Sequence, residues 1–72
     1  MKRADYDYSK LRVLILRIYG TYTAFAKALG IRPATLSLRL TNKSHWPQPD
    51  IDVACELLEI ENPKGYFFVH KV

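Results

Sequence analysis

The stretch between Tyr22 and Asn42 restricts the fold more than any other part of the sequence. A small residue, Ala26, stands four positions before Gly30, and the apolar Leu36 follows six positions later. A small side chain lets two helices cross closely, and glycine adopts the positive φ that ends a helix in a tight turn. An apolar residue can then anchor the next helix to a core. This order predicts two short helices that meet at a sharp corner, with a plain helical hairpin as the alternative.

Caps and apolar spacing predict five helices in all. Asp7 or Ser9 is suited to cap the first helix and Thr21 the second, while Gly20 is expected to end the first in a left-handed conformation. The first helix has an apolar stripe at helical spacing that is expected to be buried, formed by Leu11, Leu14, Ile15 and Ile18. The expected helices span residues 8–19, 22–29, 33–41, 49–59 and 63–68. The expected core includes Phe25, Leu36, Leu40, Ile51, Leu58 and Phe67.

These signals predict a compact, all-α domain of five helices. Seventy-two residues suffice for one domain, expected over residues 1–72, with the two-helix corner near residues 22–42. Residues 1–7 and 69–72 are expected to be a flexible N-terminus and a flexible tail. The apolar run Val13–Leu16 is far shorter than the ~20 residues that a membrane span needs. With one cysteine and no signal-peptide pattern after Met1, a cytoplasmic location is expected.

Charge is divided along the chain. Between Tyr8 and Pro49 every charged residue is basic, namely Lys10, Arg12, Arg17, Lys27, Arg32, Arg39 and Lys43. The next five charged residues are all acidic: Asp50, Asp52, Glu56, Glu59 and Glu61. A basic body suits a polyanion on one face, because Lys and Arg release the counterions condensed on phosphates. Two solvated faces of opposite sign are the alternative.

No pattern in the sequence indicates an enzyme. The chain has no glycine-rich phosphate loop, paired catalytic carboxylates or Ser-His-Asp arrangement, so no catalytic residue, cofactor or small-molecule ligand is expected. His45 and His70 lack further ligands at metal spacing and are expected on the surface, with no metal site. Cys55 is expected to be a buried, inert thiol, and Trp46 to fill the core beneath its loop. A solvated acidic face is expected from Asp50, Asp52 and Glu56.

Several segments resemble the Cro/CI-type helix-turn-helix family, and in particular the short single-domain Cro-like and modulator-of-repression (antirepressor) proteins of temperate phages. The resemblance covers roughly residues 8–68 and is carried by Tyr8–Leu11, Gly20–Thr21, Phe25–Ile31, Thr35–Ser37 and Ala54–Leu58. It implies a five-helix helix-turn-helix domain that acts in a lysis–lysogeny switch within the host bacterial cell. Members of this group either bind operator DNA or bind and disable a partner repressor.

The expected outward face of the helix after the corner distinguishes these two outcomes. It presents Ala34, Leu38 and Thr41, and Tyr22 stands where the family often has glutamine. Base edges are recognised by paired donors and acceptors, which an apolar face lacks, whereas such a face suits burial against protein. The leading hypothesis is therefore an antirepressor that binds the DNA-binding domain of a cognate phage repressor. Its expected protein-binding residues are Val13, Leu16, Tyr19, Tyr22, Arg32, Leu38 and Arg39.

Two alternatives remain open from the sequence. A Cro-like repressor would bind operator DNA directly, or DNA together with the repressor. Its expected DNA-binding residues are Thr21, Arg32, Ala34, Thr35, Ser37, Thr41, Asn42 and Lys43. An antitoxin-like module would instead neutralise a different partner protein. Neither alternative involves a membrane.

Overall fold

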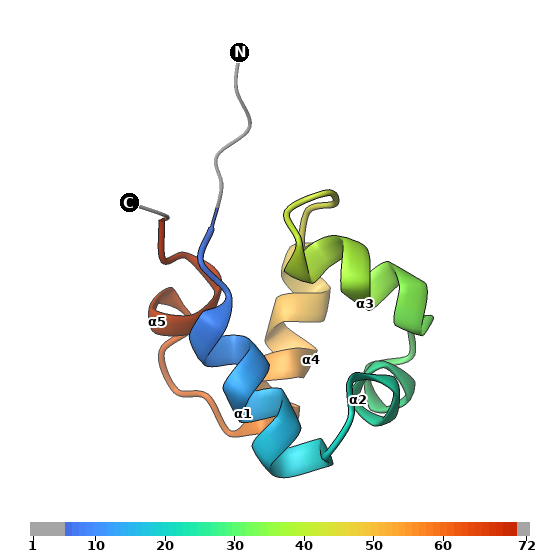
Figure 1. Ribbon diagram of the computed structural model, residues 1–72. Coiled ribbons are helices and arrows are strands. Elements are labelled where there is room, and N and C mark those ends of the chain that lie inside the picture. The colour runs from blue at the N-terminus through green and yellow to red at the C-terminus, as the bar shows by residue number, and fades with distance from the viewer. Residues whose placement is uncertain (1–5, 71–72) are drawn as a thin grey trace.

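The computed structural model describes residues 6–70, and these form five α-helices and no strand (Figure 1). The helices are α1 (Ser9–Tyr19), α2 (Tyr22–Leu29), α3 (Pro33–Leu40), α4 (Gln48–Leu58) and α5 (Lys64–Phe67). This confirms the all-α prediction, and each boundary lies within one residue of the expected position. Figure 1 shows α4 in the middle of the domain, with α1 and α5 on one side and α2 and α3 on the other.

The corner between α2 and α3 follows from its capping residues. The Thr21 hydroxyl oxygen accepts a hydrogen bond from the backbone N–H of Ala24 at 3.1 Å, which satisfies one of the free donors at the start of α2. Gly30 ends α2 with a φ of 83° and a ψ of 26°, in the left-handed region, as expected. The N–H of Ile31 then donates to the carbonyl of Ala26 at 2.9 Å. Pro33 opens α3, where its missing N–H costs no helical hydrogen bond.

The caps at the two ends of α1 agree less closely with the prediction than those at the corner. The Asp7 carboxylate accepts a hydrogen bond from the Ser9 N–H at 2.9 Å, so Asp7 supplies the cap from a position just before the helix. Gly20 ends the helix with a positive φ of 82°, but its ψ of −37° lies outside the left-handed helical region. The expected left-handed conformation is therefore wrong for Gly20, although the position still requires the positive φ that glycine tolerates.

The core draws side chains from every helix. All six residues expected in the core are buried there. Trp46 joins them from the loop between α3 and α4, as expected, and its ring meets that of Phe67 edge-on at a centroid distance of 5.0 Å. The buried hydrophobic side chains are Tyr8, Leu11, Ile15, Phe25, Ala26, Leu36, Leu40, Trp46, Ile51, Ala54, Leu58, Ile60 and Phe67. One continuous core therefore connects all five elements.

The apolar stripe of α1 is only partly buried, which corrects one expectation. Leu11 and Ile15 are fully buried, but Leu14 is half-buried and Ile18 is 44% exposed. Leu14 lies on the flank of α1 that faces α5, and Ile18 lies one turn beyond it on the same helix. Because α5 is only four residues long, it covers little of that flank. The helices that pack against α1 therefore bury only part of the apolar stripe that the sequence predicts.

The chain ends near residues 6 and 70 pair with each other. Tyr6 and His70 form an isolated antiparallel bridge, and the Asp7 N–H donates to the carbonyl of Val69. The sequence assigns all four of these residues to flexible ends, but the structure pairs them. The remainder of those expected ends, residues 1–5 and 71–72, lies outside the described residues.

Gly30→Val tests the corner. A Cβ built at Gly30 meets no atom within 4 Å, so the substitution introduces backbone strain without a clash. Because a β-branched residue resists a positive φ, we expect the free energy of unfolding to fall by about 1–3 kcal/mol, measured by urea denaturation. Gly65→Ala is the control, since Gly65 lies in a helix without a positive φ and also has open space around it. Equal stability of Gly30→Val and the parent would contradict the corner geometry.

Candidate functional site

The outward face of α3 is apolar, as the sequence predicts. Leu36 and Leu40 are buried, whereas Ala34 and Thr41 are exposed and Leu38 is 46% exposed. Ala34 and Leu38 lie one turn apart, so they form an exposed apolar strip along the helix. This strip lies on the outer side of the helix that follows the corner, away from the buried Leu36 and Leu40.

A small hollow of about 80 Å³ lies beside this helix, between α1, α2 and α3. Tyr22, the first residue of α2, lines it together with Pro33 and Ser37 of α3. Arg12 of α1 also lines the hollow, although sequence reasoning did not include it among the site residues. No local pattern could have identified Arg12, because its neighbours in the hollow belong to other helices and lie ten or more residues away in the sequence.

Arg39 lies in the interior instead of on the expected rim of a binding surface. It is only 8% exposed, and its Nη1 donates to Asp50 Oδ2 at 2.7 Å. Its guanidinium carbon lies 5.3 Å from the centroid of the Trp46 ring. Position 39 follows the buried Leu36 by three residues, which places it on the inner side of α3. Asp50 likewise binds this cation instead of joining the expected solvated acidic face.

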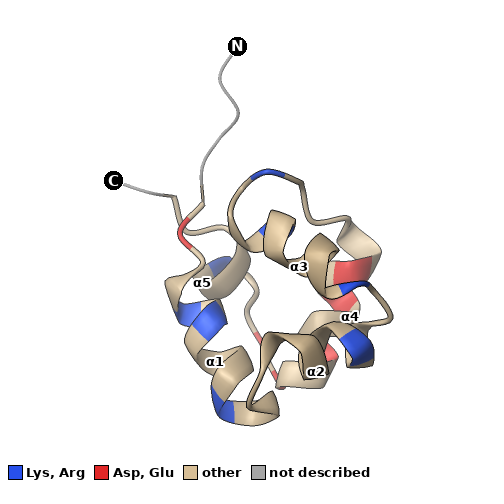
Figure 2. Cartoon of the chain, turned by 45° about the vertical axis from the view of Figure 1, so that its right-hand side comes forward, with Lys and Arg blue, Asp and Glu red and all other residues tan. Residues whose placement is uncertain are grey.

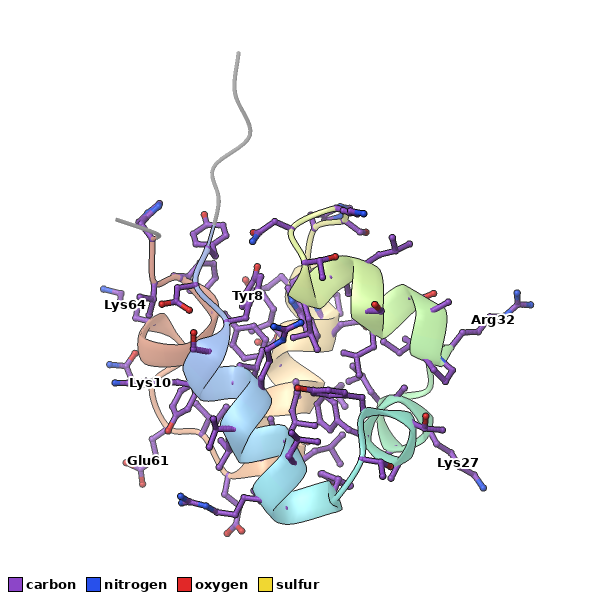
Figure 3. All side chains as sticks on the ribbon, in the orientation of Figure 1. Tyr8, Lys10, Lys27, Arg32, Glu61 and Lys64 are labelled. Atoms are coloured by element: carbon purple, nitrogen blue, oxygen red, sulfur yellow. The ribbon has the colours of Figure 1, made fainter. Side chains whose placement is uncertain are left out.

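Three of the residues expected to contact DNA use their side chains within the domain. Asn42 has a positive φ of 63°, and its amide both accepts from the N–H and donates to the carbonyl of Tyr6, at 2.9 Å in each case. The Thr41 hydroxyl donates to the carbonyl of Ser37 at 2.8 Å, and Thr21 caps α2. Exposed polar groups do remain on this side at Arg32, Ser37 and Lys43, while Thr35 is half-buried. Figure 3 shows Arg32 pointing away from the domain.

The aromatic and aliphatic residues of the expected protein-binding set differ in their exposure to solvent. Val13 and Leu16 are exposed, whereas Tyr19 and Tyr22 are half-buried against the core. The Tyr19 ring lies 5.3 Å from that of Phe25, which gives it a packing role. Val13 lines a different hollow, on the α5 flank of α1. These residues therefore do not all belong to one patch around Tyr22 and Leu38.

Basic and acidic residues lie in separate parts of the fold, as the sequence predicts, except that Arg39 and Asp50 form an ion pair with each other. Figure 2 shows several acidic positions on α4 and others outside the helices, whereas α1 carries basic positions alone. Cys55 on α4 is only partly buried, not buried as expected, and its burial, with a smaller contribution from Asp52, raises the pKa of its thiol. The thiol is therefore protonated at neutral pH, as expected of an unreactive cysteine.

The described part of the chain contains no cluster of three or more His, Cys, Asp or Glu side chains that could hold a metal ion. None of the five helices has the length and apolar character that crossing a bilayer requires. The candidate surfaces are therefore those around α1 and α3.

Residues 4–70 match the model of a protein family of unknown function, DUF739. The chain belongs to this family. The DUF739 domain is also similar to the solution structure of the modulator of repression (MOR) of the temperate bacteriophage TP901-1 from Lactococcus lactis. That match has a TM-score of 0.76 and 38% sequence identity, and it covers 88% of each chain. No curated protein matches the chain.

Asp50→Ala tests the ion pair that joins α3 to α4 in this DUF739 domain. The substitution leaves the Arg39 guanidinium mostly buried without its acidic partner, so we expect a loss of about 1–3 kcal/mol in the free energy of unfolding. Asp52→Ala is the matched control, because Asp52 is an exposed carboxylate on the same helix. We expect it to change stability by less than about 1 kcal/mol. Equal effects in urea denaturation would mean that the buried pair has no special role.

Proposed function

We propose that this protein is an antirepressor of a temperate phage, which binds the DNA-binding domain of a partner repressor and keeps that repressor from its operator. The similarity to the TP901-1 modulator of repression supports a role in regulating a phage repressor. The antirepressor mechanism rests on a separate observation, which is the chemistry of the surface around α3.

The apolar strip of Ala34 and Leu38 carries the proposal. Alanine and leucine side chains have no hydrogen-bonding groups and can contact a thymine methyl, but they cannot distinguish most base pairs. An exposed leucine at the centre of a protein contact, by contrast, gains free energy from burial. In this proposal Leu38 is the central anchor, Tyr22 contacts the partner beside it, and Arg32 contributes charge at the rim.

The internal hydrogen bonds described above weaken the alternative of a Cro-like repressor. A direct operator-binding protein positions itself through many contacts to phosphates. Asn42 and Thr41, which stand where such contacts are expected, bind the domain's own backbone, and Arg39 is paired with Asp50. Arg32 and Lys43 remain available for phosphate. They support weak, nonspecific attraction to DNA better than they support operator recognition.

We therefore expect the protein alone to bind DNA weakly, with little sequence preference and strong sensitivity to salt. Contacts that neutralise phosphates release counterions, so the affinity should fall steeply as salt rises. The measurement is a mobility-shift titration of operator and scrambled duplexes at two salt concentrations. A strong operator preference that persists at physiological salt would instead establish the Cro-like alternative.

Leu38→Ala tests the contact with the repressor directly. We expect the affinity for the cognate repressor to fall by about 2 kcal/mol, or about 30-fold, because a central anchor is lost. Val53→Ala is the control, since Val53 on α4 has a similar exposure of 41% against 46% for Leu38. Both variants should unfold at nearly the parent's urea concentration, because both side chains are solvent-exposed. Full binding by Leu38→Ala, or an equal loss in Val53→Ala, would place the interface elsewhere.

The same variants connect binding to function. In a mobility shift with operator DNA and the cognate repressor, the parent protein should release the repressor from DNA. Leu38→Ala should require a correspondingly higher concentration for the same release. Release by Leu38→Ala at the parent's concentration would contradict the proposed mechanism.

A further inference from the structure

A second hollow lies on the flank of α1 that faces α5, away from the small hollow lined by Arg12 and Tyr22. Its volume is about 310 Å³, and its lining side chains are Ser9, Lys10, Val13, Leu14, Arg17 and Tyr66. The first five come from one helix and Tyr66 from α5. The hollow therefore extends along the side of α1 instead of penetrating the core.

Apolar side chains in and beside this hollow are exposed to solvent. Val13 is 58% exposed, the highest value among the exposed large hydrophobic side chains of residues 6–70. The half-buried Leu14 lies beside it, and Ile18 continues the same flank one turn later at 44% exposure. Around the helix Leu14 lies between Val13 and Ile18; Leu14 packs partly against the core, whereas Val13 and Ile18 remain exposed, and these three residues are here called the ridge.

The charged groups at this ridge are cationic. Lys10 and Arg17 flank Val13, three residues before it and four residues after it. The ion pair recorded among residues 6–70 joins Arg39 to Asp50, so neither Lys10 nor Arg17 has an acidic partner in the described structure. Figure 3 shows Lys10 and Lys64 pointing outward on this side. Glu61 also appears on this side, but it does not line the hollow.

We propose that the ridge of Val13, Leu14 and Ile18 is a second protein-binding surface, whose occupant is an acidic amphipathic helix of a partner protein. Lys10 and Arg17 are seven residues apart on α1, which separates their Cα atoms by about 10 Å along the helix axis. A partner helix with carboxylates at the same spacing and apolar residues between them can pair with both cations and cover Val13. This surface does not depend on the contact assigned to Leu38.

The apolar ridge favours a protein over a nucleic acid at this surface. Lys10 and Arg17 could contact phosphates, but Val13 and Ile18 would then be buried against a charged, hydrated backbone and would gain little. An amphipathic helix matches both the cations and the apolar residues Val13 and Leu14 that lie between them.

The test is an NMR titration of the labelled protein with a synthetic helical peptide of about 15 residues. The peptide carries glutamates seven residues apart with leucines between them, and a second peptide has lysines in place of the glutamates. We expect saturable shifts at Val13, Leu14, Arg17 and Tyr66 with the glutamate peptide and at least tenfold weaker binding of the lysine peptide. Arg17→Glu and Lys10→Glu should each reverse this preference, since both positions are exposed and the fold should persist.

Arg12→Glu is the matched control, because Arg12 is an exposed arginine on the opposite flank of the same helix. It should bind the glutamate peptide like the parent.

The absence of saturable shifts, or equal binding of the two peptides, would overturn the proposal. It would also be overturned if a random-sequence DNA duplex produced the same shifts. Concentration-dependent shifts at Val53 and Glu56 without peptide would overturn it as well, because the acidic α4 of a second copy would then occupy the ridge.

Discussion

The close crossing at the corner between α2 and α3 is the constraint on which the rest of the structure depends. Ala26 and Leu36 are fully buried on either side of Gly30, whose positive φ turns the chain between them. Since α2 packs against α1, α3 and α4, this corner sets the position of three other helices. A domain of 72 residues has little free energy to spare, so a change at the corner affects both the fold and the surface of α3.

The orientation of α3 then decides which of its side chains are available to a partner. The same rotation that buries Leu36 and Leu40 also directs Arg39 inward to Asp50 and leaves Ala34 and Leu38 exposed. The helix consequently loses a cation from its surface and keeps an apolar strip. The pair joins α3 to α4, and removal of Asp50 would leave the Arg39 guanidinium buried without an acidic partner.

Helix α1 separates two surfaces with different chemistry. On one flank Arg12 lies near Tyr22 and Ser37, beside the surface proposed for repressor binding. On the other flank Lys10 and Arg17 border the exposed ridge that continues to Ile18. The short α5 leaves this second flank open, so the domain has enough surface for two separate contacts despite its size.

The sequence by itself determined the helices, the caps at the corner between α2 and α3, most of the buried core and the apolar outward face of α3. These features depend on local spacing and on residues such as Thr21, Gly30 and Pro33, whose preferences act within a few positions. Only the tertiary structure decided that Arg39 pairs with Asp50, that Asn42 binds Tyr6, and that Ile18 remains exposed. Each of these outcomes requires knowing which element lies opposite a side chain. That information comes from the packing of helices that are distant in sequence, and periodicity along one helix does not contain it.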